Sequence, residues 1–211
     1  VGGPSVLVIG GGVIGMSVAL HLHWRGCDVR LVDRNALGSG VSMMGGGWVA
    51  AQGRRNPAQL AFALDSIASY PALLERVGAE AGFRETGSLM LMETPEQIEA
   101  RRAFLADQKA VPGYDGFEFL TPGELHALEP AIDSPHIAGG TWRARDCQVD
   151  PPALVAALAA GLRREGVALA EGALVEGIER GTGGWRVRTT VGDLSADLLV
   201  NAAGAQAPEI A

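Results

Sequence analysis

The chain has 211 residues, 47% hydrophobic and 19% charged, a composition that excludes an intrinsically disordered protein. It carries 17 basic and 24 acidic residues, and its basic runs are no longer than Arg doublets, which excludes the basic face of a nucleic-acid-binding protein. Its 30 glycines are about twice ordinary usage, so their positions are informative.

The N-terminal region has the pattern of a strand, a glycine turn, a helix and a second strand. Residues 6–9 form a short β-branched apolar run typical of a buried parallel strand. A G-x-G-x-x-G turn follows at residues 10–15, and the next residues predict a helix that ends near Gly26. Residues 29–32 then predict a strand. Although residues 5–22 carry no charge, three glycines interrupt them, which argues against a signal peptide or a transmembrane segment.

Each motif position in this turn has a physical role in binding a dinucleotide. Gly10 permits the tight turn, Gly12 leaves space for a pyrophosphate, and Gly15 allows close packing of helix on strand. The helix N-terminus offers free N–H groups to the phosphates. Asp33 follows Gly15 at about the distance of 20 residues expected of a carboxylate that binds a ribose. Because a carboxylate at this position would repel the 2′-phosphate of NADP, it argues against that cofactor.

A second glycine-rich segment follows at residues 38–48. So many glycines predict a loop without helix or strand, with bare backbone exposed. Met43, Met44, Trp48 and Val49 make this loop too apolar for a solvated linker. The segment therefore favours a loop that lies against a large planar ring.

The remainder of the chain alternates between helical and extended patterns. Proline and glycine mark most of the boundaries, and Pro151 and Pro152 stand in the first turn of one predicted helix. Helices are predicted at residues 57–78, 95–109, 121–129 and 150–165, and extended segments at 86–93, 139–149, 167–169, 174–178, 185–190 and 194–200. Residues 197–205 form a buried strand that ends in small residues, a second place for backbone to meet a phosphate or a flat ring.

Together these motifs resemble the FAD-dependent oxidoreductases of the D-amino-acid-oxidase type, which include glycine and sarcosine oxidases. The likeness spans the chain, and its finer pattern at Gln52, Gly53, Arg54 and Pro57 is similar to opine-oxidase and hydroxyproline-dehydrogenase flavin subunits. It rests on residues 8–33, the 42–47 loop, the Glu-Leu-x-x-Leu-Glu-Pro pattern within 120–130, the 148–151 turn and the strand end at 201–205.

The resemblance implies an α/β fold. A Rossmann-like FAD-binding domain with a parallel sheet would be interleaved with an α+β substrate domain built on an antiparallel sheet. The FAD-binding domain would comprise residues 1–84 and 148–211, and the substrate domain residues 85–147. Members of the family continue beyond the point matching Ala211, so we expect the C-terminal part of the fold to be missing from this chain.

The resemblance also implies a set of cofactor-binding residues. The turn residues would hold the FAD pyrophosphate. Asp33, with Arg34 beside it, would bind the adenosine ribose. Ser42, next to Met43, would contact a phosphate or ribose. The loop glycines would lie along the flavin, Val175 would meet adenine through its backbone, and Ala203 and Gly204 would close over the pyrophosphate or ribityl chain. The turn residues are Gly10, Gly12, Val13, Ile14 and Gly15, and the loop glycines Gly45, Gly46 and Gly47. The family commonly has Asn where Gly45 stands and an aromatic residue where Gln206 stands.

The implied activity is oxidation of the C–N bond of an amino acid or N-substituted amino acid, by hydride transfer to flavin N5. Two alternatives stay open: oxidation of a 2-hydroxy acid or glycerol phosphate, and a flavin-carrying subunit active only in a larger complex. The partners would be a small amino acid or amine and an electron acceptor, which could be oxygen, a quinone or another flavoprotein, with further subunits possible. No catalytic residue is assigned.

Several other residues have side chains that could act in catalysis or metal binding. Cys27 and Cys147 fit no metal or redox spacing and are expected to be buried thiols in a reducing cytoplasm. The four histidines lack ligand spacing, so no metal site is expected. Arg143 and Arg145 could face a substrate carboxylate, but a solvated sheet face is the favoured interpretation. Gln52 and Arg54 could reach the active site from the loop.

Overall fold

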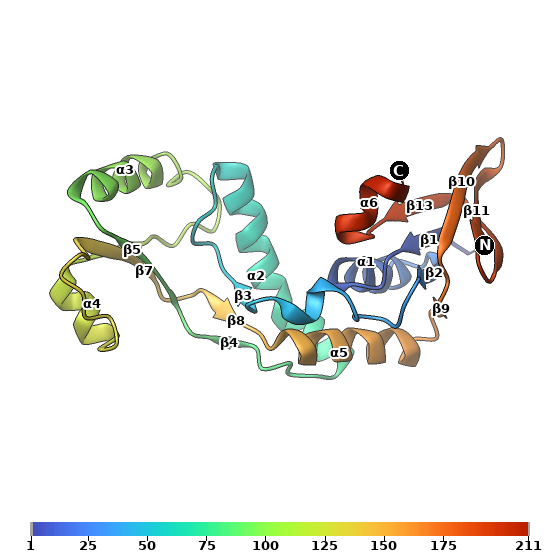
Figure 1. Ribbon diagram of the computed structural model, residues 1–211, viewed down its shortest axis with the longest axis horizontal. Helices are drawn as coiled ribbons and strands as arrows, with labels where there is room; N and C mark the ends of the chain where they lie inside the picture. Colours follow the sequence, from blue (N-terminus) through green and yellow to red (C-terminus); the bar gives the residue numbers. More distant parts are fainter. Residues whose placement is uncertain (1, 211) are drawn as a thin grey trace. The chain divides into compact units, whose positions relative to one another are not determined.

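The computed structural model describes residues 2–210, and the chain divides into two compact units (Figure 1). The first unit contains Val1–Gly46, Leu74–Ala81 and Asp150–Ala211, and the second contains Gly47–Leu73 and Gly82–Val149. The chain therefore passes between the units several times. No helix within residues 2–210 is both long and apolar enough to span a membrane.

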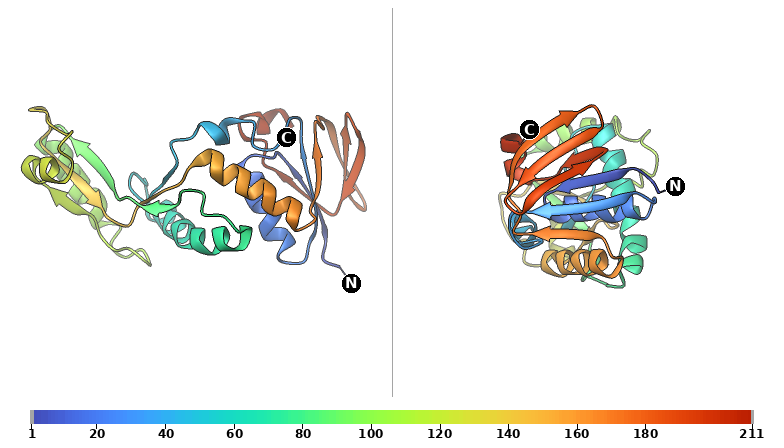
Figure 2. Two further views of the ribbon diagram at one scale, coloured as in Figure 1. Left: turned by 90° about the horizontal axis from the view of Figure 1, so that it is seen from below. Right: turned by 90° about the vertical axis from the view of Figure 1, so that its right-hand side faces the viewer.

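The first unit is built on a parallel four-stranded sheet, whose strands lie side by side in the right-hand view of Figure 2. Their spatial order is β13-β1-β2-β9. The central strand β1 pairs with β13 on one side and with β2 on the other, and both pairings are parallel. The four strands are β1 (Ser5–Ile9), β2 (Asp28–Asp33), β9 (Ala168–Glu171) and β13 (Leu198–Asn201).

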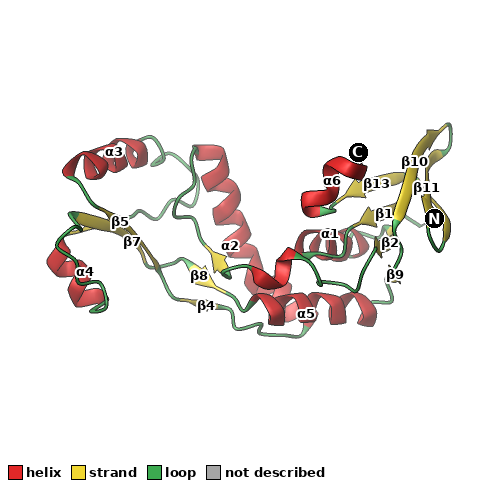
Figure 3. Ribbon diagram, viewed as in Figure 1, coloured by secondary structure: helices red, strands yellow, loops and turns green. Residues whose placement is uncertain are grey.

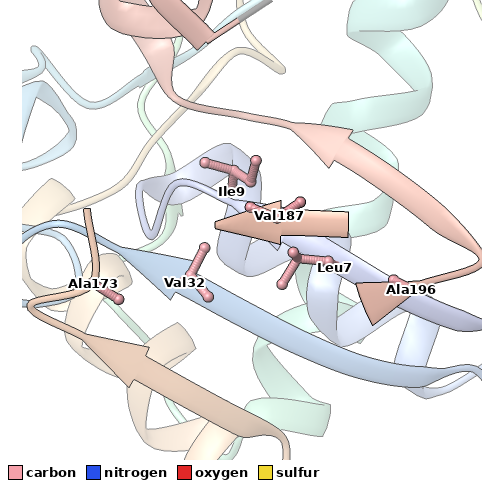
Figure 4. Close-up of a cluster of buried hydrophobic side chains, with 6 residues drawn as sticks. All are labelled: Leu7, Ile9, Val32, Ala173, Val187 and Ala196. Atoms are coloured by element: carbon pink, nitrogen blue, oxygen red, sulfur yellow. The ribbon is translucent and has the colours of Figure 1, made fainter. Parts of the chain in front are cut away.

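Helices cover one face of this sheet and a β-meander covers the other. On the helical side, α1 (Val13–His23) packs against α5 (Pro151–Arg164), which Asp150 caps. The meander consists of β10 (Val175–Gly181), β11 (Gly184–Thr189) and β12 (Gly192–Ala196), all antiparallel. Figure 4 shows the core between sheet and meander, formed by Leu7, Ile9, Val32, Ala173, Val187 and Ala196.

The last strands of the chain differ from the prediction. A single strand was predicted at residues 194–200, but the structure has two, β12 and β13, which belong to different sheets. The chain changes sheets at Asp197, whose carboxylate accepts hydrogen bonds from the N–H and the hydroxyl of Ser5. The prediction of a buried final strand was also wrong, because β13 is an edge strand and Leu198 is half exposed.

The second unit is built on two small antiparallel sheets (Figure 3). The first sheet has the order β3-β8-β4 and the second β5-β7-β6. Helix α2 (Pro57–Val77) begins in this unit, and its residues from Leu74 onward belong to the first. The other elements are β3 (Trp48–Val49), β4 (Arg84–Glu85), β5 (Ser88–Met92), α3 (Pro95–Ala106), β6 (Glu118–Leu120), α4 (Pro122–Leu128), β7 (Gly139–Arg143) and β8 (Cys147–Gln148).

These sheets confirm the predicted fold class of a parallel-sheet domain interleaved with an α+β domain on antiparallel strands. One local prediction was wrong. The 38–48 loop, predicted to lack helix and strand, contains a short 3-10 helix, η1 (Val41–Met44), and β3 begins at its end. Met44 and Trp48 are 77% and 83% exposed, so the position of this loop against a planar ring stays a prediction.

Candidate functional site

The turn between β1 and α1 leaves the N-terminus of the helix open. Gly10 has a φ of +108°, which residues with a side chain rarely adopt, and its N–H donates to the carbonyl of Val32 at 2.8 Å. Helix α1 then begins at Val13, with Gly12 as an N-cap that has no side chain to bond the helix. The turn therefore presents backbone N–H groups and the positive end of the helix dipole.

Gly15 lies beneath this turn and is not among the residues that line a pocket there. A Cβ at Gly15 would overlap the carbonyl oxygen of Gly10. Only glycine therefore allows α1 to pack this closely against the turn that precedes it.

Ser42 closes the turn from the glycine-rich segment. Its Oγ accepts a hydrogen bond from the backbone N–H of Val13 at 3.0 Å. A Cβ on Gly12 would lie 3.1 Å from the same oxygen, tighter than most real contacts, so Gly12 leaves room for this hydroxyl. Since a serine hydroxyl can donate one hydrogen bond while it accepts others, Ser42 can still donate to a ligand.

Asp33, at the end of β2, is fixed by two backbone groups. Its Oδ2 accepts from the N–H of Gly11 and its Oδ1 accepts from the N–H of Asn35, each at 2.7 Å. Each carboxylate oxygen has two lone pairs, so each can accept one further hydrogen bond. Asp33 is therefore a rigid acceptor suited to a pair of hydroxyl groups.

A pocket of ≈ 460 Å³ lies where these groups meet, at the carboxyl ends of the parallel strands. This is the usual ligand position in open α/β sheets, and the volume is typical of a small-molecule site. We call it the nucleotide pocket. The predicted site residues that line it are Gly10, Gly12, Val13, Ile14, Asp33, Arg34, Ser42, Val175, Ala203 and Gly204.

The remaining predicted residues lie outside the nucleotide pocket. Met43, Gly45 and Gly46 follow Ser42 in the first unit without lining it, and no atom lies within 4 Å of a Cβ built on Gly46. Gly47 belongs to the second unit, where its carbonyl accepts from the N–H of Val149 at 2.9 Å. Contact between the loop glycines and a flavin therefore remains a prediction.

Sequence reasoning missed several residues that line the nucleotide pocket. Asn35 and Leu174 flank predicted residues and could have been found by extending the motifs by one position. Gln206 and Glu209 belong to η2 (Gly204–Gln206) and α6 (Ala207–Ile210), which bend back over the strand ends. The resemblance marks position 206 only as one where the family commonly has an aromatic residue, and no local pattern indicates that Glu209 faces the pocket.

Glu171, at the end of β9, holds the segment that follows β2. Its Oε1 accepts from the N–H of Leu37 at 2.7 Å, and its Oε2 accepts from Nη2 of Arg163 at 3.1 Å. The hydrogen bond from Leu37 is the main cause that lowers the pKa of Glu171, partly opposed by burial and supported by Arg163. The charged carboxylate therefore fastens the chain between Asp33 and Ser42.

In the second unit, Arg143 is neither a substrate-facing residue nor part of a solvated face. It is 5% exposed, and its guanidinium pairs with Asp115 and with Asp146. Asp146, which is fully buried, also accepts from the N–H groups of Ala51 and Gln52 at 2.8 and 3.2 Å. These residues form a buried structural network.

The other candidate residues of this unit either bond within the protein or are exposed to solvent. The Gln52 amide donates to Ser88 and accepts from Thr141, so it is part of the same network. Arg54 donates to the carbonyl of Ala50, and Arg145 is 70% exposed. Within residues 2–210 no three metal-binding side chains cluster.

Comparison with known proteins identifies the class of this chain. Residues 5–211 match the DAO family, described as FAD dependent oxidoreductase, and the chain therefore belongs to this family. The predicted resemblance and the predicted cofactor, FAD, are both confirmed at this level.

Relatives with known activities cover nearly the whole chain. Mitochondrial dimethylglycine dehydrogenase from Rattus norvegicus is 32% identical in an alignment of length 211, which covers 98% of this chain and 24% of that protein. Glycine oxidase from Geobacillus kaustophilus is 31% identical in an alignment of length 212, which covers 98% of this chain and 56% of that protein. The chain thus spans about a quarter and just over half of these two relatives.

Solved structures agree with the fold. The crystal structure of glycine oxidase from Geobacillus kaustophilus superimposes with a TM-score of 0.87 at 30% identity, covering 99% of this chain and 58% of that one. That of L-proline dehydrogenase from P. horikoshii gives a TM-score of 0.89 at 25% identity, covering 98% and 54%. Both neighbours therefore contain a large part that this chain does not match.

The geometry of the nucleotide pocket fits the adenosine diphosphate half of FAD. The glycine turn leaves the backbone N–H of Gly12, and that of Ile14 in the first turn of α1, open to phosphate oxygens. Asp33 can accept from ribose hydroxyls, while Ser42 can donate to a phosphate. The phosphates and the ribose of this half-molecule thus each have a chemically matched group in the pocket.

Proposed function

We propose that the complete protein containing this chain uses FAD to oxidise the C–N bond of an amino acid or N-substituted amino acid, by hydride transfer to flavin N5. The observation that carries the proposal is the convergence of the open helix end, Ser42 and Asp33 on one pocket in a chain of the FAD-dependent oxidoreductase family. When bound, FAD supplies the electron-accepting ring.

The residues of this chain bind and orient the cofactor. The N–H groups of Gly12 and Ile14 hold the pyrophosphate, and the Ser42 hydroxyl, which accepts from the N–H of Val13, donates to it. Asp33 accepts from the adenosine ribose, with Arg34 beside it, and the backbone of Val175 meets the adenine. Ala203 and Gly204 close over the pyrophosphate or ribityl chain, and Gly45, Gly46 and Gly47, with Met43 beside them, lie along the flavin.

The two compact units suggest a division of labour. The first unit contains the nucleotide pocket, and we assign FAD binding to it. The second unit carries antiparallel sheets, and we assign to it part of the substrate site. Its buried Arg143 and Gln52 support the architecture of that unit rather than contact a substrate.

The substrate class rests on relatives named for related reactions. Dimethylglycine dehydrogenase, glycine oxidase and L-proline dehydrogenase all act on amino acids or N-substituted amino acids, according to their names. Anaerobic mixing of the complete FAD-loaded protein with glycine, sarcosine, dimethylglycine or proline tests the proposal. We expect at least one amine to bleach the flavin absorbance and neither lactate nor glycerol 3-phosphate to do so. Bleaching by the hydroxy compounds alone would contradict it.

Further parts of the proposal concern partners and location. The electron acceptor is oxygen, a quinone or another flavoprotein, and reoxidation of the reduced protein by each distinguishes them. Sizing the native complex tests for further subunits and for the alternative of a flavin-carrying subunit that is inactive alone.

We place the protein in the cytoplasm, a proposal supported by its two cysteines, Cys27 and Cys147, which are both free thiols.

A further inference from the structure

Two polar side chains of the last turn line the nucleotide pocket without an internal partner. Gln206 ends η2 and Glu209 lies on α6. Among residues 2–210 neither side chain has a hydrogen-bond partner, and Glu209 has no ion pair. Arg34 also lines the pocket but does not pair with Glu209. A polar pocket wall without internal partners has its hydrogen-bonding capacity available for a ligand.

The position of this turn is fixed by the protein itself. Asn201 donates from Nδ2 to the carbonyl of Ala207 at 2.9 Å and accepts from the N–H of Ala203 at 3.2 Å. Gly204 has a φ of +59°, which allows the chain to reverse direction after β13. Ile210 packs against the hydrophobic core between sheet and meander, where Val175 also packs. Helix α6, which carries Glu209, is therefore held beside β10 at the end of the pocket where Val175 lies, and Gln206 lines the pocket from the turn that leads into α6.

Charge indicates which part of a dinucleotide suits this end. The pyrophosphate is matched to the open N-terminus of α1, and the ribose to Asp33. A second carboxylate, that of Glu209, would repel phosphate oxygens but attracts a hydrogen-bond donor. The adenine carries such a donor in its 6-amino group, and a glutamine amide can pair with an adenine edge through two hydrogen bonds.

We propose that Gln206 and Glu209 recognise the adenine of bound FAD through its 6-amino group. The Glu209 carboxylate accepts one N–H of this group, while the Gln206 amide oxygen accepts the other and the amide N–H donates to N1 of the ring. The inference rests on the proposed function, because it requires FAD in the nucleotide pocket. It gives a polar role to Gln206, where the family commonly has an aromatic residue.

The two residues respond differently to a changed base. In the hypoxanthine analogue of FAD, a carbonyl oxygen replaces the 6-amino group. Hypoxanthine also carries a hydrogen on N1, so a glutamine amide rotated by half a turn can donate to the new oxygen and accept from N1–H. A carboxylate accepts only, so Glu209 would face another acceptor. Glu209 is therefore the residue that discriminates between the two bases.

The test is a binding titration that needs no turnover. The complete apoprotein is titrated with FAD and with flavin hypoxanthine dinucleotide, and the quenching of flavin fluorescence gives each dissociation constant. We expect FAD to bind about tenfold more tightly, near the lower end of the range for a paired base contact because Glu209 is exposed. Glu209→Gln should reduce this ratio to about two, because its amide can pair with either base.

The controls separate failure of the inference from failure of the proposed function. Glu80→Gln changes an exposed carboxylate of the same unit that does not line the pocket, and it should keep the wild-type ratio. Gln206→Leu should weaken both dinucleotides by a similar factor. Equal affinity of the wild type for both, or an unchanged ratio in Glu209→Gln, overturns the inference alone. If the apoprotein binds neither dinucleotide, the proposed function fails and the inference fails with it.

Discussion

The hydroxyl of Ser42 accepts a hydrogen bond from the backbone N–H of Val13 at 3.0 Å, although the two residues are far apart in the sequence. This contact joins the glycine-rich segment to the first residue of helix α1. The helix end is therefore completed by a side chain from a second motif, and the two glycine-rich segments form one site.

Ser42→Ala should weaken FAD binding without unfolding the protein. The variant loses one hydrogen bond to the ligand, and the Val13 N–H loses its acceptor. A net cost of about 1–1.5 kcal/mol corresponds to roughly a tenfold higher dissociation constant. Fluorescence titration of the apoprotein measures it, with Ser195→Ala, an exposed serine on β12, as control. Equal affinity of Ser42→Ala and wild type would show that the hydroxyl has no role.

Gly12→Ala should act through Ser42. The backbone of Gly12 has φ −76° and ψ −179°, which alanine adopts without strain, so the melting temperature should be close to that of the wild type. Its new Cβ would lie 3.1 Å from the Ser42 oxygen and displace it, which weakens FAD binding. In a double-mutant cycle, Gly12→Ala and Ser42→Ala together should cost less affinity than the sum of the single changes. Additive losses would refute the coupling.

Gly15→Ala should destabilise the fold itself. The added methyl would overlap the carbonyl oxygen of Gly10, and relieving the overlap requires α1 to move away from the turn. Overpacking of this kind costs about 1–3 kcal/mol. Thermal unfolding of the apoprotein measures the loss. Gly183→Ala is the matched control, since a Cβ there would meet no atom within 4 Å and should leave stability nearly unchanged.

Asp146→Ala should destabilise the second unit. The change removes the acceptor for two backbone N–H groups and leaves the buried guanidinium of Arg143 with one carboxylate partner, Asp115. Removing one partner of a buried ion pair lowers the free energy of unfolding by about 3–5 kcal/mol. Chemical unfolding should report a loss of this size. Asp133→Ala, at an exposed position of the same unit, should unfold like the wild type.

Glu171 should make stability depend on acid pH. Because its pKa in the folded state is lowered, its charged form stabilises the fold, and the contribution is present above the ordinary value of 4.5. It is lost as the pH falls through the lowered pKa. The effect should be small, since the pair with Arg163 is exposed. Melting temperatures measured downward from pH 6 should therefore fall less steeply for Glu171→Gln than for the wild type. Parallel curves would contradict this.

Much of the first unit could be predicted from sequence because its signals are local. The apolar strand, the three motif glycines and Asp33 each follow from steric or hydrogen-bonding needs within a short segment. The final strands were misjudged for a related reason. Residues 192–201 form one continuous stretch with strand character, and the change of sheet occurs at Asp197, which bonds the distant Ser5.

The parts of the site that escaped prediction depend on tertiary contacts. Gln206 and Glu209 reach the pocket only because Asn201 and Ile210 fold the last turn back over the strand ends. Arg143 alternates with polar neighbours and suggested an exposed strand, whereas Asp115 and Asp146 bury it. Pairing between residues distant in sequence leaves no periodic pattern.

The central claim is that the nucleotide pocket binds the adenosine diphosphate half of FAD. The most direct test titrates the complete apoprotein with FAD and with FMN, which lacks the adenosine monophosphate part of FAD, and adds ADP as a competitor. Several hydrogen bonds to charged groups, each worth about 1.5–3 kcal/mol, predict that FAD binds at least about 100-fold more tightly than FMN and that ADP displaces it. FMN binding as tight as that of FAD, with no competition by ADP, would contradict the account.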